Sequence, residues 1–313
     1  MSAPRRMLRR RAVGLALLAS CLMLGPVGAA GKDGWTLPVP TLGGRQVWSD
    51  VLVRDGWRVQ KNLLTGRHRL LDRDDWRRAG SSYDEAVRAL DRQVPRTGSK
   101  AADVVVLVHG LGRTRHSMDR MKAALEARGH RVVAVGYAST RAGVRDHADR
   151  LSGIVAGLEG VRRVQFVTHS YGAFVVRQAI GTGAWTDSIE VAGLVMLAPP
   201  SRGAVLADRL NRFGLFRLVA GGGGQDVTSK GAEHVPLPDG VRLCVIAGGR
   251  SDGKGYNPLL EGDNDGIVRV EEARLPEAGD FMVVPEIHTF IMNHPQTTEA
   301  AARFLRGGTC RVE

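Results

Sequence analysis

A serine between a predicted strand and a predicted helix is the residue best placed for covalent chemistry. Val164 to Val167 is a short apolar run that predicts a buried strand, and Tyr171 to Ile180 predicts a largely apolar helix. A tight turn, T-H-S-Y-G, connects them. The turn would expose the hydroxyl of Ser170 above the helix N-terminus, where developing negative charge is stabilised. Gly172 is the small residue that such a turn needs after the serine, whereas Thr168 replaces the usual glycine before it.

A base and an acid are needed to make a serine hydroxyl nucleophilic. His288 follows a predicted strand, Phe281 to Val284, and Asp265 follows the predicted strand that ends near Ala247. Serine, acid and histidine then occur along the chain in an order that is known for such triads. We therefore predict Ser170, Asp265 and His288 as a catalytic triad, with Asp263 as the alternative acid.

Acyl transfer also needs two N–H groups directed at the oxyanion. The loop H-G-L-G at residues 109–112 follows the predicted strand Val104 to Val108, where such a loop should lie. We predict the backbone N–H groups of Leu111 and Tyr171 as the oxyanion hole. His109 and His169 flank the site, but neither follows a late strand, so both are interpreted as structural.

Alternating strands and helices must position these residues. Apolar runs predict strands, and longer amphipathic or apolar stretches predict the helices between them. The strands are 104–108, 132–135, 164–167, 191–197, 241–247 and 281–284, and the helices are 117–128, 144–158, 171–180 and 295–305. Repeated units of this length predict an α/β fold, a mainly parallel sheet with helices on both faces. The reactive residues then follow the carboxyl ends of strands, where open parallel sheets bind ligands.

The chain is expected to divide into three parts. Residues 1–30 form a signal peptide, 31–98 a small N-terminal elaboration, and 99–313 the catalytic domain. Asp55-Gly56 between two alternating runs predicts a tight hairpin in the elaboration, and Ser82 with Glu85 predicts the start of a helix. A Gly-rich insertion at about 199–240 could form a lid; its apolar pieces, Leu215-Phe216 and Leu218-Val219, would line an acyl pocket or form ordinary core helix.

The N-terminus has the pattern of a secretory signal peptide. Five Arg residues precede the apolar run Ala12 to Leu24, and small residues up to Ala30 offer a cleavage site. We expect an exported protein, periplasmic or secreted. The alternative is a lipoprotein, because Leu18-Ala19-Ser20-Cys21 resembles a lipobox with Cys21 as the lipidated residue. After export Cys244 and Cys310 would remain, either as a disulfide, which an oxidising compartment permits, or as two buried thiols.

The composition is that of a globular protein. Apolar residues make up 43% and charged residues 24%, which excludes a disordered or fibrous chain. The formal net charge is +12, and removal of residues 1–30, which hold five Arg and no acid, would lower it to +7. The basic charge forms either a solvated surface or a weak contact with an anionic membrane. Basic and aromatic residues do not interleave, so we expect no nucleic-acid partner.

The segment Ala101 to Arg306 resembles bacterial α/β-hydrolases of the lipase and esterase superfamily. The resemblance lies in H-G-L-G, T-H-S-Y-G, and the strings at 197–200, 264–268 and 288–290. Asn264 to Val268 resembles the acid loop of secreted triacylglycerol lipases, which favours Asp265 over Asp263. The resemblance implies a cofactor-independent serine hydrolase. Some lipases of this kind bind calcium near the histidine loop, but no clear ligand set for it is visible here.

The expected function is hydrolysis of a carboxylic ester through an acyl-enzyme, with a small-molecule or lipid ester as substrate. A thioesterase or amidase with the same triad is the alternative within enzymes. A non-catalytic envelope binding protein on this fold is the alternative outside them. A metal-dependent hydrolase using Asp263, Asp265, His288 and His294 is a further option, but no closely spaced histidine motif supports it.

Overall fold

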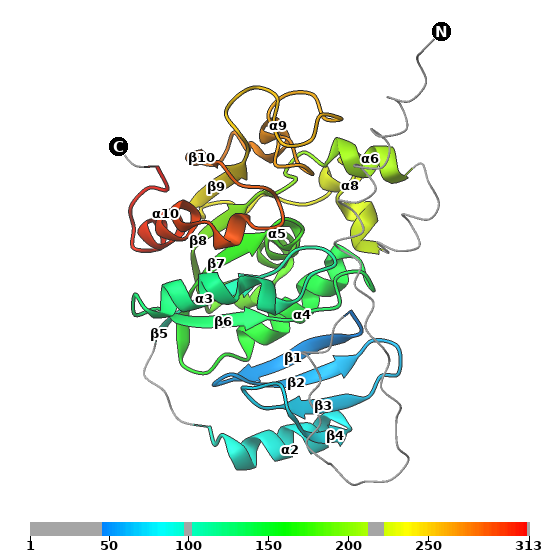
Figure 1. Ribbon diagram of the computed structural model, residues 1–313. Coiled ribbons are helices and arrows are strands. Elements are labelled where there is room, and N and C mark those ends of the chain that lie inside the picture. The colour runs from blue at the N-terminus through cyan, green and yellow to red at the C-terminus, as the bar shows by residue number, and fades with distance from the viewer. Residues whose placement is uncertain (1–45, 97–101, 212–221, 312–313) are drawn as a thin grey trace.

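Six parallel strands form the central sheet of the protein, for which a computed structural model describes residues 46–96, 102–211 and 222–311 (Figure 1). The strands lie in the order β10-β9-β8-β7-β5-β6, and every neighbouring pair is parallel. Their bounds are β5 Ala102–Val108, β6 Arg131–Val135, β7 Val161–His169, β8 Glu190–Leu197, β9 Leu243–Gly248 and β10 Asp280–Val284. Strand β7, which precedes Ser170, lies in the interior of the sheet.

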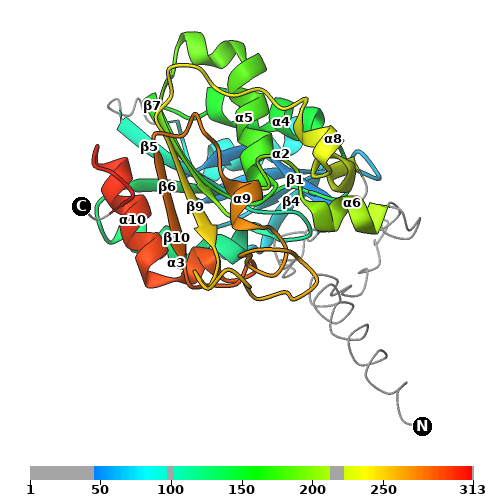
Figure 2. The same cartoon turned by 90° about the horizontal axis from the view of Figure 1, so that it is seen from above.

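Helices cover both faces of this sheet, as Figure 2 shows from above. They are α3 Asp119–Glu126, α4 Val144–Ala156, α5 Gly172–Thr182, α9 Val270–Ala273 and α10 Pro295–Leu305, with 3-10 turns η1 Arg115–Met118, η2 Ala184–Asp187 and η3 Ile291–Asn293. Side chains alternate across β5: Val104, Val106 and Val108 pack with α4 and α5, whereas Val105 and Leu107 pack with α3 and α10. Burial on both faces explains the uninterrupted apolar run of this strand.

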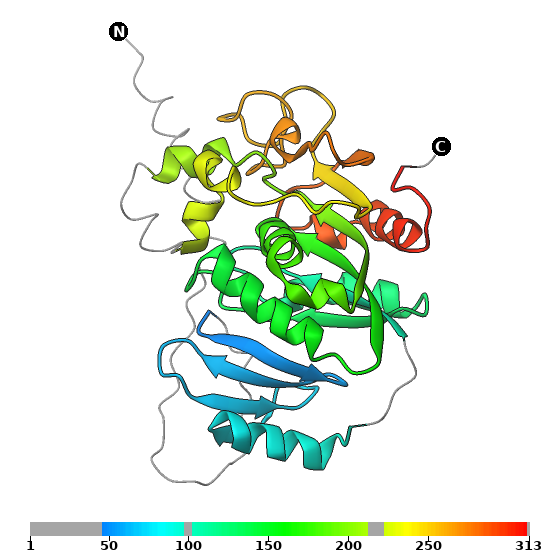
Figure 3. The same ribbon diagram turned by 180° about the vertical axis from the view of Figure 1, so that it is seen from behind.

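A second, antiparallel sheet precedes the central one. It consists of β1 Trp48–Arg54, β2 Trp57–Asn62, β3 His68–Leu71 and β4 Arg77–Ser81, and α2 Tyr83–Gln93 packs on it. The turn at Asp55 and Gly56 has positive φ at both residues, as a tight hairpin requires, and Ser82 caps α2 by accepting the N–H of Glu85. Figure 3 shows this sheet beside α4, and Asp50 exchanges backbone and side-chain hydrogen bonds with Gly136 at the end of β6.

The predicted fold class is confirmed, including a β-rich N-terminal part. The described part of the insertion consists of short helices, α6 Val205–Asn211, residues 222–226 and α8 Ser229–Ala232, and contains no strand. The apolar pieces Leu215-Phe216 and Leu218-Val219 and the signal segment 1–30 lie outside the described residues. The domain bounds and the lid function stay predictions. Among the described residues no helix is long and apolar enough to span a membrane.

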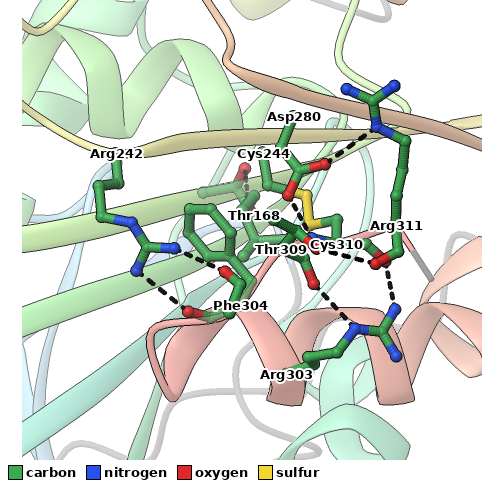
Figure 4. The surroundings of a disulfide bond; sticks show 11 residues. Thr168, Arg242, Cys244, Asp280, Arg303, Phe304, Thr309, Cys310 and Arg311 are labelled. Carbon is green, nitrogen blue, oxygen red and sulfur yellow. Dashed lines mark hydrogen bonds and ion pairs between the residues drawn. A yellow bond between two sulfur atoms is a disulfide. The ribbon is translucent and has the colours of Figure 1, made fainter. Parts of the chain in front are cut away.

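A disulfide joins Cys244 on β9 to Cys310 after α10 (Figure 4). Both cysteines are buried. The carboxylate of Asp280, at the start of β10, accepts the N–H of Cys310, and Arg303 on α10 donates to the carbonyl of Thr309 at 2.8 Å. The C-terminal segment is therefore held to the edge of the sheet that carries the loop to His288.

Candidate active site

Ser170 lies at the sharp turn between β7 and α5. Its φ is +51°, a left-handed conformation that non-glycine residues rarely adopt. The turn is held by a 2.8 Å hydrogen bond from the N–H of Ser170 to the carbonyl of Leu197, the last residue of β8. Backbone strain of this kind persists only where the surrounding structure enforces it, and it is a feature of serine nucleophiles on a strand-to-helix elbow.

The residues on either side of the elbow show why its sequence is restricted. A Cβ atom at Gly172 would lie 2.6 Å from the carbonyl oxygen of Val108, closer than packing allows, so a glycine is required there. Thr168, which replaces the usual glycine before the serine, lies at the buried end of β7. Its hydroxyl donates to the carbonyl of Val195 at 3.3 Å, so the larger residue is accommodated without an unpaired polar group.

The structure brings together the three residues of the predicted triad. The Nε2 atom of His288 lies 3.0 Å from Oγ of Ser170, and its Nδ1 atom lies 2.7 Å from Oδ2 of Asp265. Asp265 and His288 are buried, at 2% and 7% exposure, whereas Ser170 is half-buried. The other carboxylate oxygen of Asp265 accepts the N–H groups of Ile267 and Val268, which fixes the carboxylate toward the imidazole.

The alternative acid, Asp263, is directed elsewhere. Its carboxylate accepts the backbone N–H groups of Arg250 at 2.7 Å and Ser251 at 2.8 Å. Those bonds hold the loop after β9 in place. Asp265, and not Asp263, is therefore the carboxylate that contacts the imidazole of His288.

Leu111 and Tyr171, the predicted oxyanion donors, belong to two segments that meet at Ser170. Leu111 belongs to the loop after β5, and Tyr171 directly follows Ser170. Within the described residues, neither backbone N–H donates to a backbone carbonyl. The loop passes close to the serine, because a Cβ atom at Gly110 would lie 3.1 Å from Cβ of Ser170 and 2.8 Å from Nδ1 of His169. Glycine is thus required for this approach.

The imidazoles of His109 and His169 are each hydrogen-bonded to a backbone carbonyl rather than to Ser170. The Nε2–H of His169 donates to the carbonyl of His288 at 3.0 Å, and the Nδ1–H of His109 donates to the carbonyl of Gly110 at 2.9 Å. Burial lowers the pKa of His109 to about 3 and the pKa of His169 well below its usual value. Both imidazoles are therefore uncharged at neutral pH, and neither is hydrogen-bonded to Ser170.

Asp226, in the insertion, contacts Tyr171, which the sequence did not predict. Its Oδ2 atom accepts the hydroxyl of Tyr171 at 2.8 Å and the N–H of Val144 at 2.8 Å. Burial raises the pKa of Asp226. The residue stands in a Gly-rich stretch without periodicity, so nothing in the sequence pairs it with Tyr171.

The residues of the alternative metal site do not converge. Among the described residues, no group of three or more His, Cys, Asp and Glu side chains is arranged to hold a metal ion. Asp263 is occupied by backbone N–H groups and Asp265 by His288, as described above. His294 is the N-cap residue of α10.

Comparison with known proteins places the chain in a family. Residues 105–282 match the model of the alpha/beta hydrolase family. No curated protein sequence matches the chain. Among solved structures, the lipase BlEst2 from Bacillus licheniformis in its mature form is similar, with 18% identity and a TM-score of 0.50, over 63% of this chain and 89% of the lipase.

A second solved structure has the same degree of similarity. It is the phospholipase PlaB from Legionella pneumophila in complex with thio-NAD, at 18% identity and a TM-score of 0.50. The match covers 66% of this chain and 59% of PlaB. At identities this low, the similarity to these two structures shows a shared fold and nothing further. The family model spans more than half of the sequence and includes the serine elbow and the acid loop, so the chain belongs to the alpha/beta hydrolase family.

Proposed function

We propose that the protein is a serine hydrolase that cleaves carboxylic esters through an acyl-enzyme. The observation that carries the proposal is the pair of contacts of His288, 3.0 Å from Oγ of Ser170 and 2.7 Å from Oδ2 of Asp265. These are the distances at which an imidazole can accept a proton from a hydroxyl while a carboxylate stabilises the imidazolium.

In the first step, Oγ of Ser170 attacks the carbonyl carbon of the ester while Nε2 of His288 takes the serine proton. The N–H groups of Leu111 and Tyr171 donate to the oxyanion that develops on the carbonyl oxygen. The tetrahedral intermediate then expels the alcohol, which leaves with the proton from His288. In the second step a water molecule gives a proton to His288 and attacks the carbonyl carbon of the acyl-enzyme. The bond from that carbon to Oγ of Ser170 then breaks, His288 returns the proton to Oγ, and the acid is released.

The same triad could act on a thioester or an amide, because only the leaving group differs. We favour esters of apolar acids, since Phe290, two residues after His288, is a large apolar side chain with 49% of its surface exposed. Hydrolysis of p-nitrophenyl esters of graded chain length, beside an acyl thioester and an anilide, separates these substrates. Faster turnover of the thioester or anilide than of every ester would overturn the ester assignment.

Labelling with a fluorophosphonate probe tests the nucleophile directly. We expect the wild-type protein to be labelled and Ser170→Ala to be neither labelled nor active while remaining folded by circular dichroism. Ser188→Ala, which changes an exposed serine outside the site, is the matched control and should behave as wild type. A folded wild-type protein that takes no label would instead support a non-catalytic binding protein.

We propose also that residues 1–30 direct export. The disulfide supports this location, because disulfides persist mainly in oxidising compartments. Expression of the full chain followed by mass spectrometry of the exported protein should give a mature chain that begins at Gly31. A lipid-modified N-terminus at Cys21, lost in Cys21→Ser, would replace simple cleavage by a lipoprotein pathway.

A further inference from the structure

A cavity of about 530 Å³ lies between the N-terminal sheet and the edge of the central sheet. The β1–β2 hairpin forms one wall, and β6 and α3 form the others. None of the residues assigned to the triad or the oxyanion hole lines it. Its volume is in the range of pockets that hold small molecules.

Five buried charged side chains are clustered at this junction. Each is at most 7% exposed, and the cluster consists of three guanidinium groups and two carboxylates: Arg58, Arg69, Arg115, Asp50 and Asp75. Arg58 is paired with Asp50 and Arg115 with Asp75, so the positive charge in excess is that of Arg69, which donates to Gln60 behind the cavity wall and does not line the cavity. Burial lowers the pKa of Arg69 to about 10 and also lowers the pKa of Arg115, and the charge of Arg58 adds to the effect on Arg115. An uncompensated buried charge is costly, so a negative group from outside would be stabilising.

Arg58 lines the cavity, and not all of the N–H donors of its guanidinium group are used. Its Nη1 group donates to Asp50 at 2.5 Å and to the carbonyl of Ala134 at 3.4 Å. Its Nε–H has no hydrogen-bond partner among the described residues, although the side chain is more than nine-tenths buried. Asp50 does not accept a further hydrogen bond from Arg58, because its carboxylate also accepts from the side chain of Gln60 and from the N–H of Gly136.

Two further arginines and three acidic residues line the remaining walls. Arg73 and Arg131 line the cavity, and each donates to a backbone carbonyl rather than to a carboxylate. Three acidic residues also line it, of which Asp119 is paired with His116 and Glu126 with Lys122, while Asp55 is exposed at the hairpin turn. Arg73 and Arg131 therefore carry charges that no carboxylate of the described residues pairs with, whereas the guanidinium of Arg58 is paired with Asp50 and offers only its remaining donors.

We propose that this cavity binds a small molecule that carries a phosphate or carboxylate group, with the guanidinium of Arg58 as its anchor. The planar fork of an arginine can donate two parallel hydrogen bonds to an oxyanion, which a lysine cannot do. Arg73 and Arg131 contribute charge at the rim. The site is independent of the proposed esterase chemistry.

Calorimetric titration of the full chain with inorganic phosphate, and separately with citrate, tests the site. Sodium chloride at equal ionic strength is the blank. We expect saturable binding of at least one anion, and the stronger one identifies the group. In Arg58→Lys the dissociation constant should rise about tenfold or more, because charge is kept but the fork is lost. The double variant Arg73→Gln/Arg131→Gln should weaken binding severalfold.

Arg120→Gln is the matched control, because it removes an exposed arginine from α3 that does not line the cavity. It should bind as wild type. If Arg58→Lys fails to fold, the double variant at the rim decides. No binding of either anion at about 10 mM, well beyond the range of specific sites, or equal weakening by Arg120→Gln, would overturn the proposal. So would binding of an acidic peptide alone, which would point instead to pairing with the edge of β6.

Discussion

The hydroxyl of Tyr171 donates a 2.8 Å hydrogen bond to Asp226, and this bond links the oxyanion hole that we propose to the insertion. The contact does not stand alone. A Cβ atom at Gly223 would lie 2.7 Å from Cδ1 of Leu111 and 3.1 Å from Cζ of Tyr171. The insertion therefore packs on both residues whose N–H groups we assign to the oxyanion.

Loss of this bond should slow catalysis without weakening substrate binding. We expect Tyr171→Phe and Asp226→Ala each to lower kcat by about tenfold with little change in KM, since a displaced oxyanion donor acts on the transition state. The double variant should be no slower than the slower single one, because both remove the same interaction. Steady-state kinetics on a p-nitrophenyl ester provide the measurement. Additive losses in kcat would contradict the coupling between the two residues.

The two neighbouring carboxylates should differ sharply in their effect on activity. Asp265→Asn removes the charge that stabilises the imidazolium and should lower kcat by about 10⁴-fold, as in other triads. Asp263→Asn is the matched control, because that carboxylate accepts backbone N–H groups that an amide oxygen can still accept in part. It should retain activity within a few fold. Reversal of the two results would identify Asp263 as the acid.

Acid should destabilise the protein through buried histidines. Burial holds the pKa of His109 at about 3, below the ordinary value of 6.5, so the folded state favours the uncharged imidazole. This contribution to stability is complete above pH 6.5 and is lost as the pH falls toward 3. Between pH 6.5 and pH 5 the free energy of unfolding should decline by about 2 kcal/mol on account of this residue.

Urea unfolding of His109→Gln at the two pH values checks this prediction. The variant should lose about 2 kcal/mol less than wild type over that interval. His234→Gln, which replaces an exposed histidine, should lose as much as wild type. An identical pH dependence in wild type and His109→Gln would show that His109 does not couple folding to protonation.

The disulfide should contribute a large part of the free energy of unfolding. It joins residues 66 positions apart, and closing a loop of that length in the unfolded chain stabilises the folded state by about 4 kcal/mol. We expect the double variant Cys244→Ser/Cys310→Ser to unfold at a correspondingly lower urea concentration. Reductant should bring wild type to the same midpoint and leave the variant unchanged. A reductant-insensitive wild type would mean that the thiols are not joined.

The sequence by itself predicted the elements of the central sheet and the three residues of the candidate triad. Periodicity defined the strands and helices, because an apolar run such as Val104 to Val108 is stable only when buried on both faces. The turn around Ser170 could be predicted because strand, serine and glycine are adjacent in the chain. The order of Ser170, Asp265 and His288 then indicated which residues should meet, since the carboxyl ends of parallel strands share one edge.

The tertiary structure decided what depends on distance between remote segments. The sequence favoured Asp265 over Asp263 only by resemblance, and the tertiary structure shows where each carboxylate points, because the direction of a side chain in a loop follows from backbone hydrogen bonds that no spacing encodes. The tertiary structure paired Cys244 with Cys310 and Asp226 with Tyr171, and it gathered the arginines of the N-terminal sheet beside β6. Local patterns carry information over one strand or one turn of helix, whereas these contacts arise only when the sheets pack.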